Sequence, residues 1–430
     1  MIKTVFVAGY GCCSNIALTR AIESLLSEKG FALVNSLDEA DFAVVNTCTV
    51  KTETEQRMLN KIKDASSRCH TVVTGCMANV QAGVLRINFP NISIVSPSLI
   101  ELIPNVLSSS TPVTIIKTDK LPPLYPKVVN RRLIVPVARG CLGNCSYCIV
   151  KKALGDLRSY PPEHIIDCIK NTLTEKPLEI FITAQDTAVY GRDLHSHTDL
   201  VTLVNEILKF EGNFMIRIGM MTPNGAIAIK DRLLGLFRNE RVYKFLHIPL
   251  QSGDDEILKS MGRQYDSRSF IELANFFREN IHDLTLVTDV IVGFPGEDDR
   301  SFRRTVEVIK AVKPDKVNIS RFTPRPHTIA NLMPQIPARI KATRSMEMTK
   351  ICKMISLMRR REFLGTITKI LTLKSMGPVF YGKTHSFIPI LLKPLAYTEI
   401  GKFYEANISG LSSSGFKGVI LRPYMLSQIV

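Results

Sequence analysis

The stretch Gly140-Cys141-Leu142-Gly143-Asn144-Cys145-Ser146-Tyr147-Cys148 carries three cysteines at the spacing C-x-x-x-C-x-x-C, with an aromatic residue directly before the third. It follows the apolar run Leu133–Ala138, which predicts a buried strand. A loop at this place lies at the carboxyl end of a strand, where β/α barrels carry their reactive groups. The stretch therefore indicates both the fold of the middle of the chain and the position of its chemistry.

We expect Cys141, Cys145 and Cys148 to bind three irons of a [4Fe–4S] cluster. No fourth cysteine follows at a usable spacing, so one iron stays open. An open iron can chelate the amino and carboxylate groups of S-adenosylmethionine, and an electron then cleaves the sulfonium bond to give a 5′-deoxyadenosyl radical. Zinc is the competing metal, but structural zinc sites prefer four protein ligands. Cysteines without a function are the third alternative.

The middle of the chain, residues 130–363, alternates strand-like runs with helical patterns such as Pro162–Thr174 and Asp199–Lys209. Six β/α units predict an incomplete TIM-like barrel. The expected strands are Leu133–Ala138, Glu179–Thr183, Met215–Gly219, Lys244–Pro249, Leu286–Val292 and Lys316–Phe322.

The first part, residues 1–111, shows the same alternation and predicts a doubly wound parallel sheet. We expect strands at Thr4–Ala8, Phe42–Val45 and Val72–Thr74, with helices at Asn15–Glu28 and Glu53–Ala65. Residues 112–129, rich in proline, are expected to be a linker.

Cys12, Cys48 and Cys76 each come just after one of these three strands. The carboxyl ends of parallel strands share one edge of the sheet, so these cysteines could hold a second cluster. Ordinary buried cysteines remain the alternative.

The last part, residues 364–430, has short β-rich runs broken by Gly, Ser and Pro, which predict a small antiparallel barrel. The chain has a net charge of +16, and residues 338–430 hold 15 Lys and Arg against 4 Asp and Glu. A basic C-terminal module of this kind is typical of nucleic-acid binding. A soluble basic enzyme without such a partner is the alternative.

The N-terminal residues lack the features of a signal peptide, and no apolar run approaches the length of a membrane span. We therefore expect a cytoplasmic protein with no membrane partner. Thiols stay reduced in the cytoplasm, so its ten cysteines are expected to be metal ligands or core residues rather than disulfides.

On these motifs the chain resembles the tRNA methylthiotransferases over nearly its whole length. The N-terminal contexts are Tyr10-Gly11-Cys12-Cys13-Ser14-Asn15, Asn46-Thr47-Cys48-Thr49-Val50 and Gly75-Cys76-Met77-Ala78-Asn79. Within that family it is most similar to the archaeal and eukaryotic branch that acts on N6-threonylcarbamoyladenosine at position 37 of tRNA. The stretches Thr183–Asp193, Arg217–Met220, His247–Gly253, Thr288–Glu297 and Phe322–Pro326 support that branch.

The resemblance implies a cluster domain, a radical S-adenosylmethionine barrel and a TRAM domain. It also implies a second [4Fe–4S] cluster, with Cys12 rather than Cys13 as ligand, and S-adenosylmethionine as both methyl donor and radical source. We expect further catalytic or cofactor contacts from Tyr147, Asp186, Arg217 and Gln251.

We expect the partners to be the anticodon stem-loop of tRNA and an electron donor such as ferredoxin or flavodoxin, and the protein to be a monomer. The basic barrel should hold phosphates, with Lys369, Lys374, Lys383, Lys402 and Lys417 as candidates.

The chain departs from the family pattern at two places. Leu154 stands where Arg is usual, and His327 stands where Gly is usual in Pro-Arg-Pro-Gly-Thr. The first departure puts a substrate contact in doubt, for which Lys151, Lys152 or Arg158 could substitute.

Several alternatives remain. The same chemistry could act on N6-isopentenyladenosine or on a ribosomal-protein aspartate. The chain could also be a non-catalytic RNA-binding relative, or a radical enzyme that inserts sulfur into a small molecule.

Overall fold

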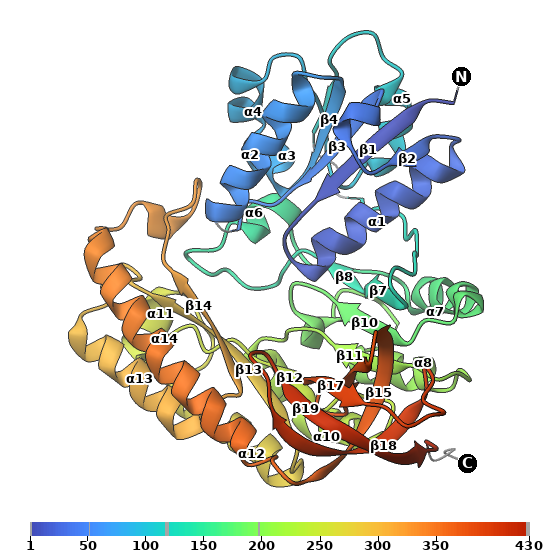
Figure 1. Cartoon of the computed structure of the whole chain (residues 1–430). Coiled ribbons are helices and arrows are strands. Elements are labelled where there is room, and N and C mark those ends of the chain that lie inside the picture. Colours follow the sequence, from blue (N-terminus) through green and yellow to red (C-terminus); the bar gives the residue numbers. More distant parts are fainter. Residues whose placement is uncertain (1, 51, 117–119, 197, 427–430) are drawn as a thin grey trace.

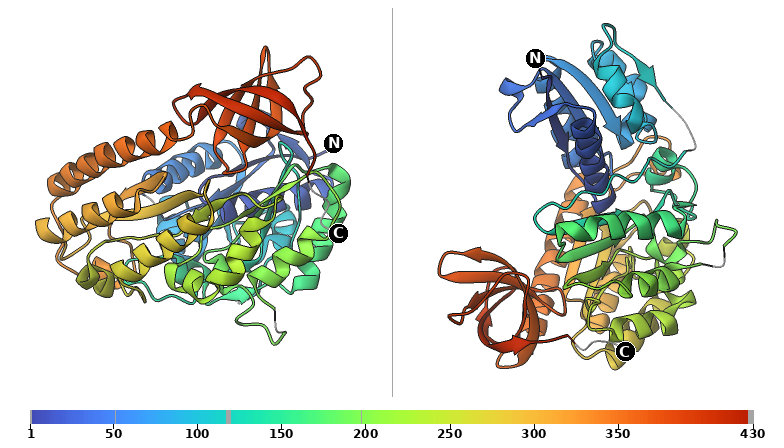
Figure 2. Two further views of the ribbon diagram at one scale, coloured as in Figure 1. Left: turned by 90° about the horizontal axis from the view of Figure 1, so that it is seen from below. Right: turned by 90° about the vertical axis from the view of Figure 1, so that its right-hand side faces the viewer.

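The computed structural model describes residues 2–50, 52–116, 120–196 and 198–426, and it contains three main β structures in chain order (Figure 1). We call them the N-terminal sheet, the central half-barrel and the C-terminal barrel. Two further views show the half-barrel in contact with the other two structures (Figure 2).

The N-terminal sheet has six parallel strands in the order β2-β1-β3-β4-β5-β6. One apolar core under α1 and α5 covers one face, and a second under α2 and α4 covers the other, so the prediction of a doubly wound sheet is confirmed. The sheet extends to β6, inside the segment expected to be a linker. The bounds are β1 Thr4–Gly9, α1 Cys13–Glu28, β2 Ala32–Val34, β3 Phe42–Thr47, α2 Thr52–Ser66, β4 His70–Gly75, α3 Cys76–Val80, α4 Ala82–Asn88, β5 Ser93–Val95, α5 Ile103–Leu107 and β6 Thr114–Ile115.

The central half-barrel has the six predicted parallel strands, in two ladders, β7-β10-β11 and β12-β13-β14, that meet between β11 and β12. In the described part of the chain β7 and β14 are not paired with each other, so the barrel is open. The strands are β7 Arg132–Pro136, β10 Glu179–Thr183, β11 Met215–Ile218, β12 Phe245–His247, β13 Thr285–Val292 and β14 Lys316–Arg321. The intervening elements are β8 Ala138–Arg139, α6 Val150–Leu154, β9 Arg158–Ser159, α7 Pro162–Thr172, α8 Leu200–Leu208, α9 Pro223–Ala228, α10 Lys230–Arg238, α11 Asp255–Ser260, α12 Ser267–Asn280 and α13 Asp299–Val312.

Alternation along the strands gives the half-barrel two different faces. Ile180 and Ile182 of β10 pack with the helices in the largest apolar core. Phe181, between them, points to the opposite, inner face, because successive side chains of a strand alternate. The inner face therefore collects residues that the helices do not cover.

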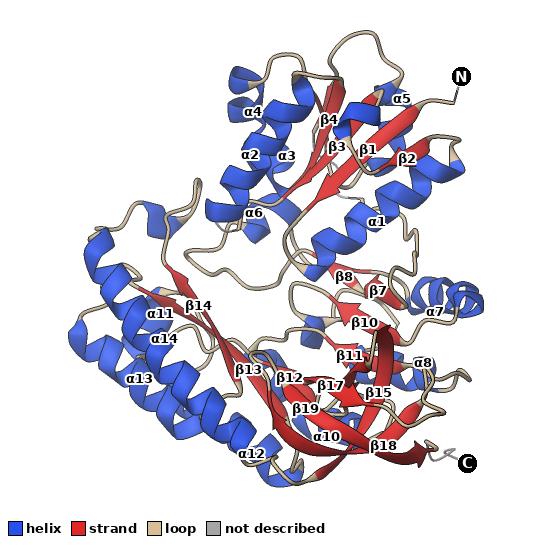
Figure 3. Ribbon diagram, in the orientation of Figure 1, coloured by secondary structure: helices blue, strands red, loops and turns tan. Residues whose placement is uncertain are grey.

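The C-terminal barrel is closed by five strands in the order β15-β16-β17-β19-β18 (Figure 3). Four pairings are antiparallel as expected, whereas β17 pairs with β19 in parallel. The helix α14, Ala338–Arg361, connects it to the half-barrel. The strands are β15 Ile367–Met376, β16 Val379–Thr384, β17 Pro389–Lys393, β18 Phe403–Leu411 and β19 Phe416–Tyr424.

The C-terminal barrel packs on the inner face of the half-barrel. Leu371 and Phe403 share an apolar core with Tyr243 and Phe245. Phe387, in the turn between β16 and β17, lies edge-on to Phe181 and Phe245, with ring centroids 5.6 and 4.9 Å apart. Within the described residues, no helix combines the length and apolar character needed to cross a membrane.

Candidate functional site

The three-cysteine loop is held in a fixed conformation after β8. The backbone N–H of Ser146 donates to Met261 O at 3.0 Å, and its hydroxyl donates to Ser260 O at 2.8 Å. Gly140 has φ +76, and a Cβ there would lie 2.0 Å from Asp156 O, so only glycine suits this position. Contacts made by Ser146 and the conformation of Gly140 therefore position the loop.

The sulfur atoms of this loop lie close together. A Cβ added to Gly143 would be 3.4 Å from Cys141 Sγ and 3.8 Å from Cys145 Sγ, and the Gly143 N–H donates to Cys141 Sγ at 3.3 Å. Arg263 Nη1 lies 3.1 Å from Cys145 Sγ, so a cation faces a prospective thiolate. Burial raises the pKa of Cys148 to about 11 and also raises that of Cys141.

The donor set suits a cluster better than a single ion. In the described structure no three His, Cys, Asp or Glu side chains converge on one metal position, and all ten cysteines are free thiols. In a [4Fe–4S] cluster each thiolate binds a different iron, so the sulfurs stand apart around it. The Gly143 N–H at Cys141 Sγ and the Arg263 guanidinium at Cys145 Sγ add hydrogen-bond donors next to the thiols that would bind such a cluster.

The second set of cysteines lies at the carboxyl edge of the N-terminal sheet. Cys12 follows β1 and is exposed, Cys48 follows β3 and is buried, and Cys76 follows β4 and is half-buried. A Cβ on Gly11 would lie 3.0 Å from Cys48 Sγ, so the turn after β1 touches the end of β3. Burial and the charges of Cys12 and Cys48, with a contribution from Cys148, raise the pKa of Cys76.

A cleft lies between the N-terminal set of cysteines and the half-barrel. Cys12 and Cys76 line one side of it, and Arg139, Leu154 and Gln185 of the half-barrel line the other. The prolines of the segment 122–126 also border it. Helix α3, which begins with Cys76, packs against α6, which follows Cys148, so the two sets lie near each other.

Two side-chain contacts hold the cleft walls together. Asn79 Nδ2 of α3 donates to Ala153 O of α6 at 2.7 Å. Arg325 Nη1, in the loop after β14, pairs with Glu55 Oε2 of α2 at 2.6 Å. The hydroxyl of Thr49, next to Cys48, donates to the same Glu55 oxygen at 2.9 Å. Sequence reasoning missed Glu55, because its partner is 270 residues away.

Tyr147 and Gln251 have defined surroundings, and their roles toward a cofactor stay predictions. The Tyr147 ring packs behind the cysteine loop, 6.3 Å from the Phe294 ring. Gln251 has φ +65, which is strained for a residue with a side chain, and its buried Oε1 has no hydrogen-bond partner among the described atoms. Gln185 Oε1, at the cleft, is unpartnered as well. These unpaired acceptors mark where a ligand could donate hydrogen bonds.

Asp186 is used locally. Its Oδ1 accepts from the N–H groups of Ala188 and Thr222, each at 3.1 Å, and its Oδ2 accepts from the Thr222 hydroxyl. Burial raises the pKa of this carboxyl. Asp186 therefore fixes the turn after β10, and a direct role toward the cofactor stays a prediction.

Arg217 and Cys13 meet on the inner face, next to Ile134, which also lines the cleft. Arg217 Nη1 lies 4.0 Å from Cys13 Sγ, and Cys13 packs in an apolar cluster with Ile134 and Phe181. Cys12 lines the cleft and Cys13 does not.

The inner face also carries a polar row that sequence reasoning missed. His247 Nε2 lies 3.0 Å from Asp289 Oδ2, and Asn318 Nδ2 donates to Asp289 Oδ1 at 2.7 Å. Each residue interrupts an apolar parallel strand at an inward position, and this was the available signal.

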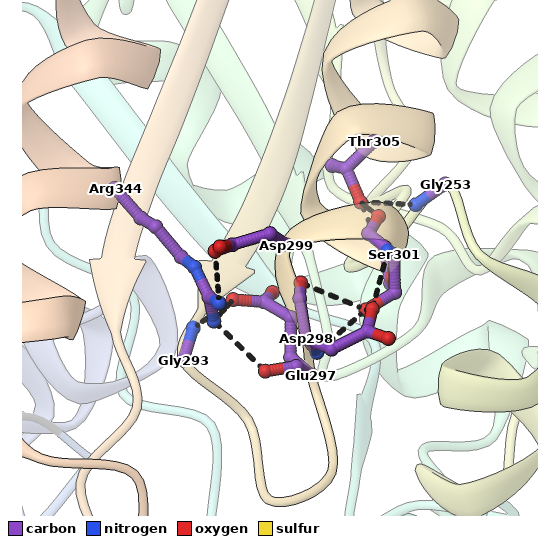
Figure 4. A network of polar contacts seen from close by, with 9 residues as sticks. Gly253, Gly293, Glu297, Asp298, Asp299, Ser301, Thr305 and Arg344 are labelled. Carbon is purple, nitrogen blue, oxygen red and sulfur yellow. Dashed lines mark hydrogen bonds and ion pairs between the residues drawn. The ribbon is translucent and has the colours of Figure 1, made fainter.

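The loop after β13 is fixed by a network of charged groups (Figure 4). Glu297 accepts from the Gly293 N–H and from Arg344 of α14, each at 2.8 Å. In the middle of α13, Thr305 Oγ1 accepts from the Gly253 N–H at 2.9 Å, which anchors the strained turn at Gln251. The network thus supports the turn that carries Gln251, a candidate ligand-binding residue.

The lysines proposed for RNA contact separate into two groups. Lys383 is buried and pairs with Glu179 at 2.6 Å, so its predicted role as a surface phosphate contact is wrong. Lys369 is paired with Glu240 at the junction with the half-barrel. Lys374, Lys402 and Lys417 are exposed.

The two departures from the family pattern also have structural settings. Leu154 lines the cleft, and Lys151 is paired with Asp156 at 2.9 Å. His327 has φ +62, the left-handed conformation in which glycine is favoured. This explains why glycine is usual at that position.

Two family models match the chain. The radical SAM superfamily model matches residues 135–309, and that of uncharacterized protein family UPF0004 matches residues 4–96. Together with the open half-barrel and the three-cysteine loop after its first strand, they define a radical S-adenosylmethionine enzyme.

Relatives that match over most of their length identify the family within this class. A probable threonylcarbamoyladenosine tRNA methylthiotransferase of Methanocaldococcus jannaschii is 38% identical over 97% of each chain. A protein of Pyrococcus horikoshii with the same name is 36% identical over 98% of this chain and 100% of its own. The human threonylcarbamoyladenosine tRNA methylthiotransferase is 30% identical over 97% of this chain and 74% of its own. The chain belongs to the threonylcarbamoyladenosine tRNA methylthiotransferase family.

Solved structures agree on the fold. The radical S-adenosylmethionine methyltransferase TsrM of Kitasatospora setae, with cobalamin and a [4Fe-4S] cluster bound, superposes with a TM-score of 0.56 at 14% identity and covers 77% of each chain. The cobalamin-dependent radical enzyme OxsB gives a TM-score of 0.52 at 10% identity, over 82% of this chain and 56% of its own.

Proposed function

We propose that this chain attaches a methylthio group to carbon 2 of N6-threonylcarbamoyladenosine at position 37 of tRNA, beside the anticodon. Family membership supports the reaction. The observation that supports the proposal is a cleft lined on one side by Cys12 and Cys76 and on the other by Arg139 and Gln185 of the half-barrel, which also carries the three-cysteine loop. Sulfur chemistry on one side and radical chemistry on the other would then act on a base held between them.

Cys141, Cys145 and Cys148 would hold one [4Fe–4S] cluster that binds S-adenosylmethionine, and Cys12, Cys48 and Cys76 would hold a second. When bound, the clusters and S-adenosylmethionine supply a radical that removes hydrogen from carbon 2 and a methylated sulfur that replaces it. Radical chemistry is needed because this C–H bond is not activated for removal by a base.

The chain's own residues bind, orient and shield. Gln251 and Gln185 each present a buried, unpaired amide oxygen, which can accept hydrogen bonds from the cofactor's amine or ribose. Tyr147 and Phe294 back the cysteine loop with apolar surface. The prolines of residues 122–126 add apolar surface to the cleft wall.

The exposed lysines of the C-terminal barrel would bind the RNA backbone. Lys374, Lys402 and Lys417 can each neutralise a phosphate, and binding should weaken as salt concentration rises. Lys152, exposed on α6 beside the cleft, is a further candidate. A reductant of the ferredoxin or flavodoxin class would supply the electron, and the protein would act as a cytoplasmic monomer. The cluster, radical and RNA-binding parts would correspond to residues 1–111, 130–363 and 364–430.

Iron and sulfide analysis with electron paramagnetic resonance on anaerobically reconstituted protein tests the two sites. We expect about eight irons in the wild type and about four in the triple variant Cys141→Ala/Cys145→Ala/Cys148→Ala. Adding Cys12→Ala to this variant should abolish the remaining signal. About four irons in the wild type, all lost in the triple variant, would exclude the second cluster.

The reaction is tested separately by mass spectrometry of nucleosides after incubation with tRNA that carries threonylcarbamoyladenosine. A 2-methylthio product is expected from the wild type and from neither Cys148→Ala nor Cys76→Ala. Formation of the product by Cys76→Ala would contradict the role of the N-terminal cysteines.

A further inference from the structure

Arg217 lies in an aromatic box on the inner face of the half-barrel. Its Cζ is 4.5 Å from the ring centroid of Phe245, 5.1 Å from that of Phe181 and 5.2 Å from that of Phe387. The first two rings come from the neighbouring strands, and the third comes from the C-terminal barrel. Stacked rings fix a planar cation and leave its in-plane N–H groups for hydrogen bonding.

The hydrogen-bond donors of Arg217 are largely unused. A guanidinium has five N–H donors, yet its Nε is buried without a partner among the described atoms. Among the described residues, the guanidinium of Arg217 makes a weak polar contact from Nη1 to Cys13 Sγ at 4.0 Å. Among the described residues no carboxylate lies within ion-pair distance of it. Leaving such donors unpaired costs stability, so the arrangement favours an acceptor supplied from outside the chain.

The surroundings of Arg217 carry excess positive charge. Arg132 and Lys383 both face the inner side of the half-barrel, and both pair with the single carboxylate of Glu179 at 2.6 Å. The Tyr243 hydroxyl also donates to Glu179, at 3.0 Å. Glu179 is thus shared by two cations, and the charge of Arg217 is left for another anion.

The position of Arg217 connects this anion site with the proposed reaction. Cys13, which it contacts, is the neighbour of Cys12 at the cleft, and Arg217 lies on β11, next to the strand that leads to Gln185. The threonylcarbamoyl group on N6 of the target carries the free carboxylate of threonine. Carbon 6, which bears it, and carbon 2, where reaction occurs, both flank N1 of the base. A base with carbon 2 in the cleft therefore carries its carboxylate close to the reaction site.

We propose that Arg217 binds the threonine carboxylate of the target nucleoside and selects it over adenosines whose N6 substituent is neutral. This inference rests on the proposed function and names a determinant of its specificity. The planar fork of arginine matches a carboxylate with two parallel hydrogen bonds, and the aromatic box keeps water from competing. It also gives Arg217 a role different from the cofactor contact that the sequence predicted.

The test compares two anticodon stem-loop RNAs that differ by one group. One carries threonylcarbamoyladenosine, and the other carries its threonine amide, which has nearly the same shape but no charge. Kd is measured by fluorescence anisotropy on reconstituted full-length protein, and kcat/KM is measured by methylthio product. The wild type should prefer the acid by roughly 30-fold or more, and Arg217→Gln should reduce the preference to less than about 3-fold, because a site built for a charged partner rejects its neutral analogue.

Two further variants make the comparison specific. Lys417→Gln, an exposed phosphate contact, should weaken binding of both RNAs equally and keep the preference. Arg217→Lys keeps a cation without the fork and should retain part of the preference, with circular dichroism and iron content reporting that the protein is folded. Kd for S-adenosylmethionine should be the same in Arg217→Gln as in the wild type.

Three outcomes would overturn the inference. A wild type that methylthiolates the acid and the amide equally well would leave the proposed function standing and exclude carboxylate recognition. A preference that survives in Arg217→Gln would assign it to another residue. An Arg217→Gln variant with weakened S-adenosylmethionine binding and an unchanged preference would place Arg217 at the cofactor. Failure of the proposed function itself is recognised differently, by the absence of methylthio product from the wild type with either RNA.

Discussion

Replacing Lys383 by methionine tests how the C-terminal barrel is held on the half-barrel. Lys383 Nζ lies 2.6 Å from Glu179 Oε1, and the two side chains are 6% and 2% exposed. Its ammonium also lies 3.9 Å from the centroid of the Phe387 ring. Methionine keeps most of the apolar stem, so the substitution removes the charge and its contacts with little loss of packing.

The expected loss follows from the burial of the pair. Removing one partner of a buried ion pair costs about 3–5 kcal/mol, because the other charge stays buried. Glu179 keeps Arg132 and the Tyr243 hydroxyl, which places the ion-pair cost near the lower end of that range. Burial opposes ionisation of Glu179, but Lys383 and Arg132 outweigh it and hold the pKa of the carboxyl below its usual value. We expect Lys383→Met to destabilise the junction by about 3 kcal/mol.

Hydrogen exchange followed by mass spectrometry measures this loss where it occurs. Amides of β16 and β17 should exchange on the order of 100-fold faster in Lys383→Met, since each 1.4 kcal/mol is a factor of about ten. Lys417→Met is the matched control, because Lys417 is an exposed residue of β19 in the same barrel. This variant should change stability by less than about 0.5 kcal/mol. The double variant Lys383→Met/Glu179→Gln should recover at least about 1 kcal/mol, because it no longer leaves a buried carboxylate. Equal exchange in Lys383→Met and Lys417→Met would refute the reasoning.

Three further predictions follow from other contacts. Glu55→Gln and Arg325→Met should each weaken the attachment of the N-terminal sheet to the half-barrel. A double-mutant cycle on urea unfolding should give a coupling energy of about 1–3 kcal/mol. Additive effects of the two substitutions would mean that this ion pair contributes nothing. Burial and the neighbouring Lys244 lower the pKa of His385 to about 4, against the opposing charge of Asp283, so the folded state holds this histidine neutral. Its contribution is therefore complete above the unfolded pKa of about 6.5, and about 3 kcal/mol of stability should be lost as pH falls from about 6.5 to 4, with His385→Gln showing a flatter profile. Gly140→Ala should lower iron incorporation and destabilise the cysteine loop by about 1–2 kcal/mol or more, because φ is +76 and the new Cβ meets Asp156 O; full iron loading in this variant would contradict the conformational requirement.

Much of the architecture could be predicted because local pattern and tertiary fold agree. The six strands of the half-barrel are short buried runs, and the structure places each within a few residues of its expected position. In the C-terminal barrel the β-rich runs Thr366–Leu373, Phe403–Ser409 and Gly418–Leu421 correspond to β15, β18 and β19. The strands β16, in which Gly382 and polar residues follow the apolar run, and β17, which begins at a proline, give a weaker signal. Pairing of β17 with β19 in parallel also leaves no local signal, because it depends on how the barrel closes.

The sequence offers a candidate site where one loop carries it and gives no signal where distant segments meet. The C-x-x-x-C-x-x-C spacing identifies Cys141, Cys145 and Cys148 as candidate cluster ligands. Lys383 looks like a surface lysine in sequence, and its burial follows only from the docking of the C-terminal barrel onto Glu179, 204 residues earlier. Asp186 lies after β10, as the sequence indicates, and its carboxylate accepts local hydrogen bonds that the sequence did not reveal.

The aromatic box around Arg217 has a consequence for how such chains can be recombined. Cys13, Phe181 and Phe387 belong to the N-terminal sheet region, the half-barrel and the C-terminal barrel, and all three meet at one guanidinium. Consider a chimera that takes its last 70 or so residues from a relative with another substrate. Its Arg217 would contact side chains of that relative's C-terminal barrel in place of those that Arg217 contacts here. The C-terminal barrel and the inner-face residues of the half-barrel, such as Phe181 and Arg217, should therefore be inherited together. All three segments should change together when such an enzyme changes its nucleoside substrate.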